Sequence, residues 1–345
     1  MHTERRSPCV LKWRITCRRP VIVAVMPLDP NMKTNHPRFD IPKYLSNVLS
    51  SPLAEVERKM STSSGIDDLI DQIIGDRTSF CFASLDTGHG GPLGIVMQEL
   101  MVRLLKDKIQ LGRGVPMDYL VWRKTPHEFP WLSRIGGMPW RDRSLPWPRS
   151  QKGDDYTFVG QFNLSDTTGT YSYDFSGDLV LIFFAFNEAM YGGEGDIILE
   201  WSTKELANPL SKQDCPPAGF PVPELFAELH RTLEYPDFNY TPEIFDQIYD
   251  LVPASKRVGW DPVPEITRIG TTEHNGLQGN LDDEPLLFAL GCFSPSYDWP
   301  FPDRKEPLQG RGHDQWFDGD RIIASGGPVM YVQSADGQSL AHRTS

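Results

Sequence analysis

The sequence predicts an α+β fold: an antiparallel, sheet-rich domain with short helices and an N-terminal helical segment. Thirty prolines and 29 glycines in 345 residues favour many turns and few long helices. Strand-like runs at 156–164, 178–186 and 196–201 are separated only by turn residues, which is the pattern of antiparallel neighbours. Apolar residues with helical periodicity occur mainly before residue 110.

The region before residue 110 predicts helices at three places. One apolar face consists of Ile66, Leu69, Ile70, Ile73 and Ile74. Gly75 ends this helix, and the Ser/Thr run at 61–64 supplies its N-cap. Residues 44–60 predict a helix that restarts at Pro52, and residues 95–109 predict another amphipathic helix.

Residues 79–85 predict a short strand, followed by a glycine-rich turn at 86–92. Strand, glycine turn and helix together have the outline of a phosphate-binding loop. The turn lacks the Lys and the Ser/Thr that a P-loop places on phosphate and magnesium, and GxGxxG spacing is absent. A structural turn is therefore favoured over a ligand loop.

The second half of the chain predicts strands and two short helices. Further strands are expected at 119–123, 286–293 and 329–333. After a proline-rich linker at 216–223, residues 223–234 and 242–252 predict helices, because each has Pro in its first turn.

A short internal repeat raises the question of duplication. Ser-Arg-Ile-Gly at 133–136 and Thr-Arg-Ile-Gly at 267–270 each precede a strand, and Trp147-Pro148 and Trp299-Pro300 lie near them. A four-residue match can arise by chance, so the sequence leaves the question open. A true duplication predicts two similar sheet subdomains that pack together.

The domain organisation follows from these elements. We expect an extension at 1–32, an accessory helical segment at 33–114, the sheet domain at 115–335 and a tail at 336–345. The Arg-rich start followed by apolar residues 21–26 suggests a targeting peptide, but that apolar run is short and lacks a clear cleavage site. A disordered or wrongly assigned extension, with Met26 or Met32 as the start, is the preferred interpretation.

Charge and cysteine content narrow the class of partner. The net charge is −12, although residues 1–25 carry +5. An acidic body repels phosphate backbones and anionic lipid, so we expect no nucleic-acid or membrane partner.

Five scattered cysteines without a CxxC argue against a disulfide framework or a zinc site and indicate a reducing, cytoplasmic compartment. The apolar run 180–186 is too short to span a bilayer, which indicates a soluble protein.

One stretch resembles a known family. Its pattern is Gly136-Gly137-x-Pro139, then Trp147-Pro148, then Phe158-x-x-Gln161-x-Asn163-Leu164. This resembles the opening signature of the YwqG-like family, a bacterial domain of unknown function. The strand starting at Gly177 and the segment 324–332 are also similar to that family. The resemblance is specific over 133–186, looser over 187–335, and does not cover the first hundred residues.

The resemblance implies an α+β, mostly bacterial and cytoplasmic protein with no established catalytic residues to carry over. Some relatives lie in toxin and immunity gene neighbourhoods, which favours a binding role. The chain departs from the family in its second-half motif, which starts at Arg268, and it ends soon after residue 333, where relatives often continue. A ligand site built from that half is therefore in question.

The most chemically dense run is 310–321. Its candidate metal ligands are His313, Asp314, Asp318 and Asp320. Carboxylates beside a histidine can bind a divalent cation or act as an acid and base pair. EF-hand spacing is absent, and Asp and Gly are ordinary turn residues, so a solvated loop is the alternative.

Candidate ligand contacts lie in the family-like stretch. Gln161 and Asn163 share one face of the predicted strand, opposite the aromatic residues Phe158 and Phe162, and Arg134 can stack on an aromatic ring or bind a carboxylate. Trp140 and Trp147 complete the candidate site, and they form an expected contact surface with Trp299 and Trp316. Packing and backbone satisfaction are the alternative roles for these residues. Neither GxSxG nor HExxH occurs, so we assign no catalytic residue and no cofactor.

These features predict a soluble, non-enzymatic binding or interaction protein with a protein partner. The family resemblance implies that its role is immunity-type. A metal-assisted hydrolase that uses the loop at 310–321 is one alternative. Binding of a small polar ligand in a cleft between two sheet subdomains is another.

Overall fold

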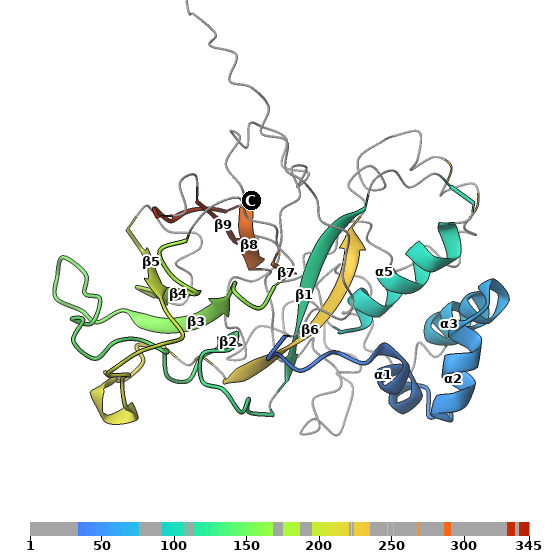
Figure 1. The fold of residues 1–345 in the computed structure, drawn as a ribbon, viewed down its shortest axis with the longest axis horizontal. Coiled ribbons are helices and arrows are strands. Elements are labelled where there is room, and N and C mark those ends of the chain that lie inside the picture. The colour runs from blue at the N-terminus through green and yellow to red at the C-terminus, as the bar shows by residue number, and fades with distance from the viewer. Residues whose placement is uncertain are drawn as a thin grey trace, which may run out of the picture.

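The structure is a computed structural model of the chain. It describes residues 34–75, 92–106, 108–109, 114–123, 125–167, 175–186, 195–220, 222, 224–234, 247, 251, 268–269, 286–290, 330–334 and 338–344. Among these residues it is an α+β protein with helices at one end and an antiparallel sheet that forms the rest (Figure 1). The predicted fold class is confirmed. The loop at 310–321, the strand and turn at 79–91, and Trp299 lie outside the described residues.

The helices predicted before residue 110 are present. They are α1 (Ile41–Val48), α2 (Leu53–Met60), α3 (Ser63–Gly75) and α5 (Pro92–Leu105). The stretch at 44–60 is divided before Pro52, as expected: α1 ends at Val48, Ser50 has a positive φ of 51°, and Pro52 is the N-cap residue of α2. The N-cap of α3 is Thr62, whose Oγ1 accepts a hydrogen bond from the Gly65 N–H at 3.1 Å.

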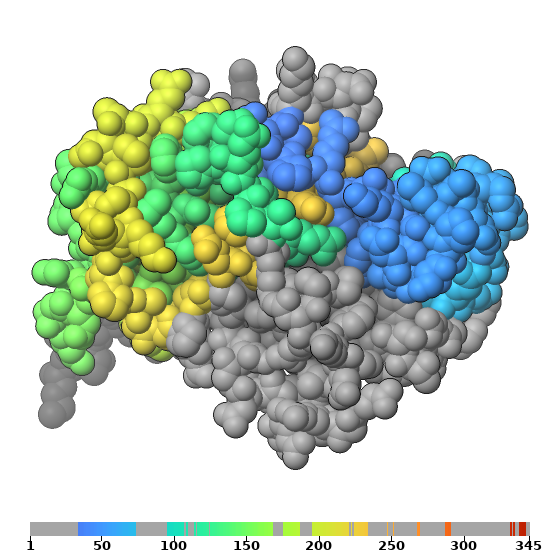
Figure 2. All heavy atoms as spheres, turned by 90° about the horizontal axis from the view of Figure 1, so that it is seen from below, coloured from blue at the N-terminus to red at the C-terminus, as the bar shows by residue number. Residues whose placement is uncertain are grey.

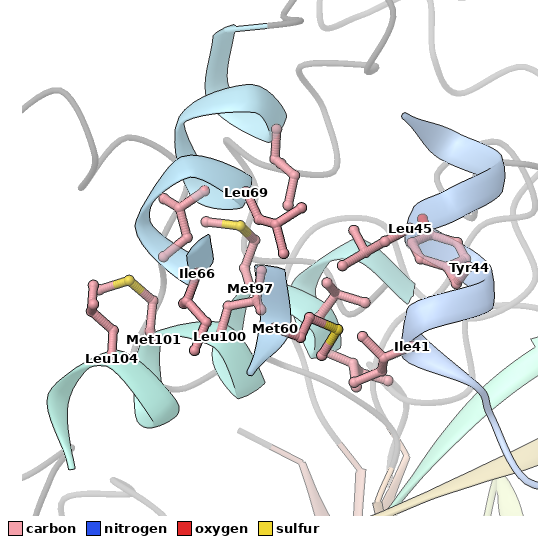
Figure 3. Packing of buried hydrophobic residues seen from close by; sticks show 14 of the residues in the cluster. Ile41, Tyr44, Leu45, Met60, Ile66, Leu69, Met97, Leu100, Met101 and Leu104 are labelled. Carbon is pink, nitrogen blue, oxygen red and sulfur yellow. The ribbon is translucent and has the colours of Figure 1, made fainter. Parts of the chain in front are cut away.

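The helices bury their apolar faces against one another and against one strand. Ile66, Leu69, Met97 and Leu100 are almost wholly buried between α3 and α5 (Figure 3). The same cluster continues into Met117, Tyr119 and Val121 of the central strand β1 (Val115–Arg123). The helical segment therefore shares its hydrophobic core with the sheet.

A polar contact also joins α5 to the sheet. The Glu99 carboxylate lies 3.4 Å from His230 Nε2 and accepts a hydrogen bond from Thr232 Oγ1 at 3.0 Å. Arg103 Nε donates to it at 2.6 Å. Burial raises the pKa of Glu99, but His230 and Arg103 outweigh burial and lower the pKa to about 2. The carboxylate stays ionised and holds α5 against the neighbouring strand.

The sheet has ten strands among the described residues, in the order β10-β9-β8-β7-β1-β6-β2-β3-β4-β5. After β1 these are β2 (Arg134–Ile135), β3 (Thr157–Asn163), β4 (Leu179–Phe184), β5 (Ile197–Ser202), β6 (Leu225–Glu234), β7 (Arg268–Ile269), β8 (Leu286–Leu290), β9 (Met330–Gln333) and β10 (Ala341–Thr344). The long pair β1 and β6 forms the centre of Figure 1.

One predicted helix is wrong. Residues 223–234 form β6, whose ladder with β1 runs from Glu234 opposite Val115 to Phe226 opposite Arg123. Leu225, Ala227 and Leu229 alternate along the strand and are all buried. Alternation with a period of two places them on one face of the sheet, and pairing on both edges outweighs the helix-start signal of the preceding proline. Of the second predicted helix, at 242–252, only Gln247 and Leu251 are described.

The sheet consists of two matching halves, β1–β5 and β6–β10. The repeated Arg-Ile pairs are β2 and β7. In the first half, β2 lies between β3 of the same half and β6 of the second half. In the second half, β7 lies in the same way between β8 of that half and β1 of the first half. Register shifts occur at 158–160 in β3 and at 286–288 in β8. The residue at the end of each shift lies opposite the isoleucine of the Arg-Ile strand: Gly160 lies opposite Ile135, and Phe288 lies opposite Ile269. The two similar sheet units are therefore halves of one continuous sheet.

A second core fills the inner face of the curled sheet. Phe162 of β3 and Phe288 of β8 stack with ring centroids 4.2 Å apart, although they belong to different halves. At the far end, Trp201 Nε1 of β5 donates to the Gln338 carbonyl at 2.6 Å, next to β10. The two edges of the sheet thus approach each other.

The segment expected to be a tail, 336–345, contributes β10, which pairs with β9. The limits of the sheet domain themselves stay a prediction. In the described part of the chain, no helix has both the length and the apolar character needed to cross a membrane.

The shared helical core makes a stability prediction. Leu69 is fully buried and Leu53 is 41% exposed, so the same substitution should differ strongly between them. Leu69→Ala should lower the free energy of unfolding by about 2–5 kcal/mol, because it leaves a cavity. Leu53→Ala should change it by less than about 0.5 kcal/mol. Urea denaturation followed by circular dichroism measures both, and equal effects would contradict the packing described above.

Candidate functional site

The predicted ligand residues lie on two adjacent strands, β2 and β3. Arg134 lies directly opposite Gln161, and Asn163 is two residues further along β3. After β2 the chain turns through Gly136 and Gly137, whose φ values of 61° and 70° favour glycine. A side chain at Gly137 would also meet Glu224.

The register shift in β3 changes one expectation about its faces. Val159 packs with Phe162 in the inner core, whereas Phe158 joins the outer cluster with Phe183. A bulge adds one residue and so reverses the alternation on one side of it. Phe158 therefore shares the face of Gln161, and only Phe162 lies opposite, as predicted.

Gln161 is an internal tie, by which we mean that its side-chain amide hydrogen-bonds to main-chain groups before and after β2. It is fully buried, and its Nε2 donates to the carbonyls of Pro130 and Leu132 at 2.8 Å each. Its Oε1 accepts from the Trp140 N–H at 2.8 Å. One amide therefore fixes the chain on both sides of β2, and its strongest hydrogen-bonding positions are occupied by the protein itself.

Arg134 is a buried cation. It is 7% exposed, and its Nη2 donates to the Met138 carbonyl. Burial lowers the pKa of Arg134 to about 10, while the charges of Glu224 and Cys215 act in the opposite direction. No carboxylate among the described residues forms an ion pair with it, and its Nε is buried without a hydrogen-bond partner.

Asn163 is fully buried and half satisfied. Its Oδ1 accepts hydrogen bonds from the N–H and the hydroxyl of Ser165 at 2.9 and 2.8 Å. Its main-chain N–H donates to Ser133 Oγ at 2.9 Å. Its Nδ2 is buried and, like Arg134 Nε, has no hydrogen-bond partner in the part of the chain that the structure describes.

Three aromatic side chains form what we call the aromatic ledge: Phe129, Trp131 and Trp140. The Phe129 and Trp131 rings stack 4.9 Å apart, and Trp131 and Trp140 lie 6.0 Å apart. All three are half-buried, and Trp140 Nε1 donates to the Lys204 carbonyl at 3.2 Å. The ledge is therefore a fixed, partly exposed aromatic surface.

Trp147 lies in a different place from Trp140. Its ring meets Phe183 edge to face at 5.4 Å, and its Nε1 donates to the Tyr156 carbonyl at 2.8 Å. The neighbouring Arg141 is buried and binds the Glu200 carboxylate through two nitrogens, at 2.6 and 3.1 Å. The structure therefore brings together Arg134, Gln161 and Trp140 but places Trp147 in the outer packing cluster.

A strap formed by residues 34–39 lies along β6 and reaches this region. Leu229 N–H donates to the Pro37 carbonyl, and Phe39 N–H donates to the Leu229 carbonyl. Figure 2 shows these first described residues, in blue, against green residues of the first half. His36 is the main contact: its Nε2 accepts a hydrogen bond from the Ser133 N–H at 2.9 Å.

His36, Ser133 and Asp166 are the residue types of a hydrolase triad, but they are not arranged as one. Their contacts instead fasten the strap to Ser133, and we call this arrangement the His36 clasp. His36 Nε2 faces the main-chain N–H of Ser133, while Ser133 Oγ accepts from Asn163. Asp166 lies 3.7 Å from His36 Nδ1. Burial, together with the charges of His127 and Arg231, lowers the pKa of His36 to about 3. The imidazole is therefore neutral and holds the strap in place.

The candidate metal ligands His313, Asp314, Asp318 and Asp320 lie outside the described residues, as does Trp316. Within the described part of the chain, no group of three or more His, Cys, Asp or Glu side chains is placed to hold a metal ion. The metal-assisted alternative stays a prediction.

Sequence reasoning did not find the strap or two members of the ledge. Phe129 and Trp131 precede the family-like stretch, and the only signal for them is the aromatic and proline run at 127–132. His36 lies about a hundred residues upstream of Ser133, and no local pattern connects them. The arrangement as a whole can donate hydrogen bonds and offer aromatic surface.

Comparison with known proteins places a family model over this region. Residues 133–207 match a domain of unknown function, DUF1963. The match starts at β2, ends just after β5, and includes Arg134, Gln161, Asn163, Trp140 and Trp147. A search of curated proteins found no match.

The role of Gln161 as a tie can be tested against an exposed glutamine. Gln161→Ala should lower the free energy of unfolding by about 3 kcal/mol, because it leaves buried donors and acceptors without partners. Gln151→Ala, at an exposed position, should change it by less than about 0.5 kcal/mol. Chemical denaturation measures both, and a stable Gln161→Ala protein would contradict the assigned role.

The His36 clasp predicts a pH dependence of stability. The pKa of His36 is about 3 in the folded protein and about 6.5 when unfolded, so the unfolded chain binds the proton first as pH falls. Stability is therefore complete above pH 6.5 and is lost progressively toward pH 3. The slope is at most about 1.4 kcal/mol per pH unit.

Denaturation between pH 7 and 5 isolates this contribution, since most carboxylates remain ionised there. His36→Gln should be less stable at pH 7 and should show a flatter pH profile over this interval. Parallel profiles for the two proteins would show that His36 does not titrate as described.

Proposed function

We propose that this protein is a YwqG-like binding protein that recognises a protein partner through the aromatic ledge. The observation that carries this proposal is the ledge itself. Phe129 and Trp131 stack, Trp140 lies next to Trp131 at a tilted angle, and all three are half-exposed. The buried Gln161 amide holds the main chain of Trp140 and of the two residues that flank Trp131. Tryptophan is a preferred anchor in protein interfaces because it buries a large area at low entropic cost.

Rigid support of the ledge favours binding. Gln161 fixes the Trp140 main chain, Ser202 Oγ donates to the Trp140 carbonyl at 2.6 Å, and the indole donates to Lys204. A surface that is already ordered loses little conformational freedom when a partner binds. This arrangement supports recognition by a preformed surface.

The resemblance to the YwqG-like family and the DUF1963 match support the choice of partner class. Some members of the family lie in toxin and immunity gene neighbourhoods. We therefore propose an immunity-type role in a bacterial cytoplasm, with the product of an adjacent gene as partner. The net charge of −12 favours a partner with a basic surface.

The test is binding of the purified full-length protein to the products of adjacent genes, measured by calorimetry. Trp140→Ala should weaken binding at least tenfold, as expected for an interface anchor. Phe186→Ala is the matched control, since this exposed aromatic residue makes no ring contact with the ledge. Circular dichroism confirms that both variants are folded.

Two outcomes would contradict the proposal. One is that no adjacent gene product binds in an assay that detects a known pair. The other is that a product binds and Trp140→Ala and Phe186→Ala have equal affinities.

A further inference from the structure

We infer that Arg134 and Asn163 form a binding site for a small oxyanion, of the carboxylate or phosphate class, on the outer face of β2 and β3. The site lies beside the aromatic ledge, from which it takes only the indole N–H of Trp131, and it does not depend on the proposed partner. It uses buried donor groups that have no partner among the described residues.

The charge of Arg134 is the first observation. The side chain is more than nine-tenths buried, yet no carboxylate among the described residues pairs with it. Glu224 is near enough to raise its pKa but forms no ion pair with it. By contrast, the buried Arg141 binds Glu200 through two nitrogens. A buried guanidinium without a counter-ion is unfavourable, and an oxyanion ligand removes that cost.

The second observation is the set of free donors. Arg134 Nε and Asn163 Nδ2 are both buried, and neither has a hydrogen-bond partner among the described residues. Because Arg134 lies opposite Gln161, Asn163 is its diagonal neighbour on the same face of the sheet. Trp131 Nε1 is a third buried donor that lacks a partner in the described part of the chain, and its residue lies between Pro130 and Leu132, whose carbonyls Gln161 binds. An arginine fork beside amide and indole donors is suited to an oxyanion.

The amide and carbonyl oxygens next to these donors are already occupied, which favours an anion over water. The oxygens of Gln161 and Asn163 already accept hydrogen bonds, as do the carbonyls of Pro130 and Leu132. A water molecule among free donors needs acceptors for its own hydrogens. An oxyanion brings acceptors only and leaves no hydrogen unpaired.

The second half differs at the position that matches Gln161. In the matching register of the second half, Arg268 lies opposite Ala289, where Arg134 lies opposite Gln161. The second half thus lacks the amide that fixes the chain above the site. The family match at 133–207 covers the first half.

Nuclear magnetic resonance of the ¹⁵N-labelled full-length protein tests this directly. Acetate and inorganic phosphate are titrated separately at constant ionic strength with chloride. The Arg134 Nε–H signal is assigned from its absence in Arg134→Lys, and the Trp131 indole signal from its absence in Trp131→Phe. Both signals should shift downfield and saturate with one of the two anions, which identifies the ligand as carboxylate or phosphate.

Three internal controls make the result decisive. The Trp147 indole already donates to Tyr156, and Arg149 Nε is paired with Asp155 at the surface, so neither signal should saturate. Asn163→Asp retains an acceptor for Ser165 but replaces the free donor with a negative charge, and it should abolish the titration. This variant tests the site even where Arg134→Lys fails to fold.

The inference is overturned if the Arg134 and Trp131 signals do not shift with either anion, or shift only linearly, as the Arg149 signal does. It is also overturned if Asn163→Asp titrates like the unmodified protein. Cross-peaks from bound water to Arg134 Nε–H that persist at the highest anion concentration would show that water occupies the site.

Discussion

The antiparallel ladder between β1 and β6 is the constraint on which the rest of the structure depends. Each of these strands receives, on its outer edge, the short Arg-Ile strand of the other half. The helices in turn bury their apolar faces on Met117, Tyr119 and Val121 of β1. Loss of the ladder would therefore open both half-sheets and expose the helical core. This exchange of strands makes the two halves one cooperative unit.

The two halves use a common framework differently. In both halves a register shift lies beside the two-residue Arg-Ile strand. A bulge of this kind bends a strand, so the two halves of the sheet bend at matching positions. Only the first half places Gln161 beneath the chain that carries Trp140. A fully satisfied buried amide makes that chain rigid, whereas free donors on Arg134 and Asn163 are costly to folding. Rigid support beside unsatisfied donors is a feature of binding sites.

The sequence predicted elements well where local periodicity and packing agree. The helices at 41–75 and 92–105 and the strands β3, β4 and β5 follow their apolar patterns. The helix prediction for 223–234 was wrong. A proline followed by residues of mixed polarity resembles a helix start, but hydrogen bonding to strands on both edges makes this segment a strand. The Arg-Ile repeat was only a four-residue coincidence until the matching bulges gave it structural meaning.

The sequence by itself determined the α+β class, the apolar faces of the helices and the strand-rich character of residues 133–207. These properties depend on neighbours within a few residues, which a single chain displays directly. Tertiary structure alone decided that β6 is central, that His36 clasps Ser133, and that Gln161 is an internal tie. It also decided that Arg134 has no counter-ion among the described residues. Those properties depend on contacts between residues far apart in the chain, and burial at such contacts determines which polar groups remain free to bind.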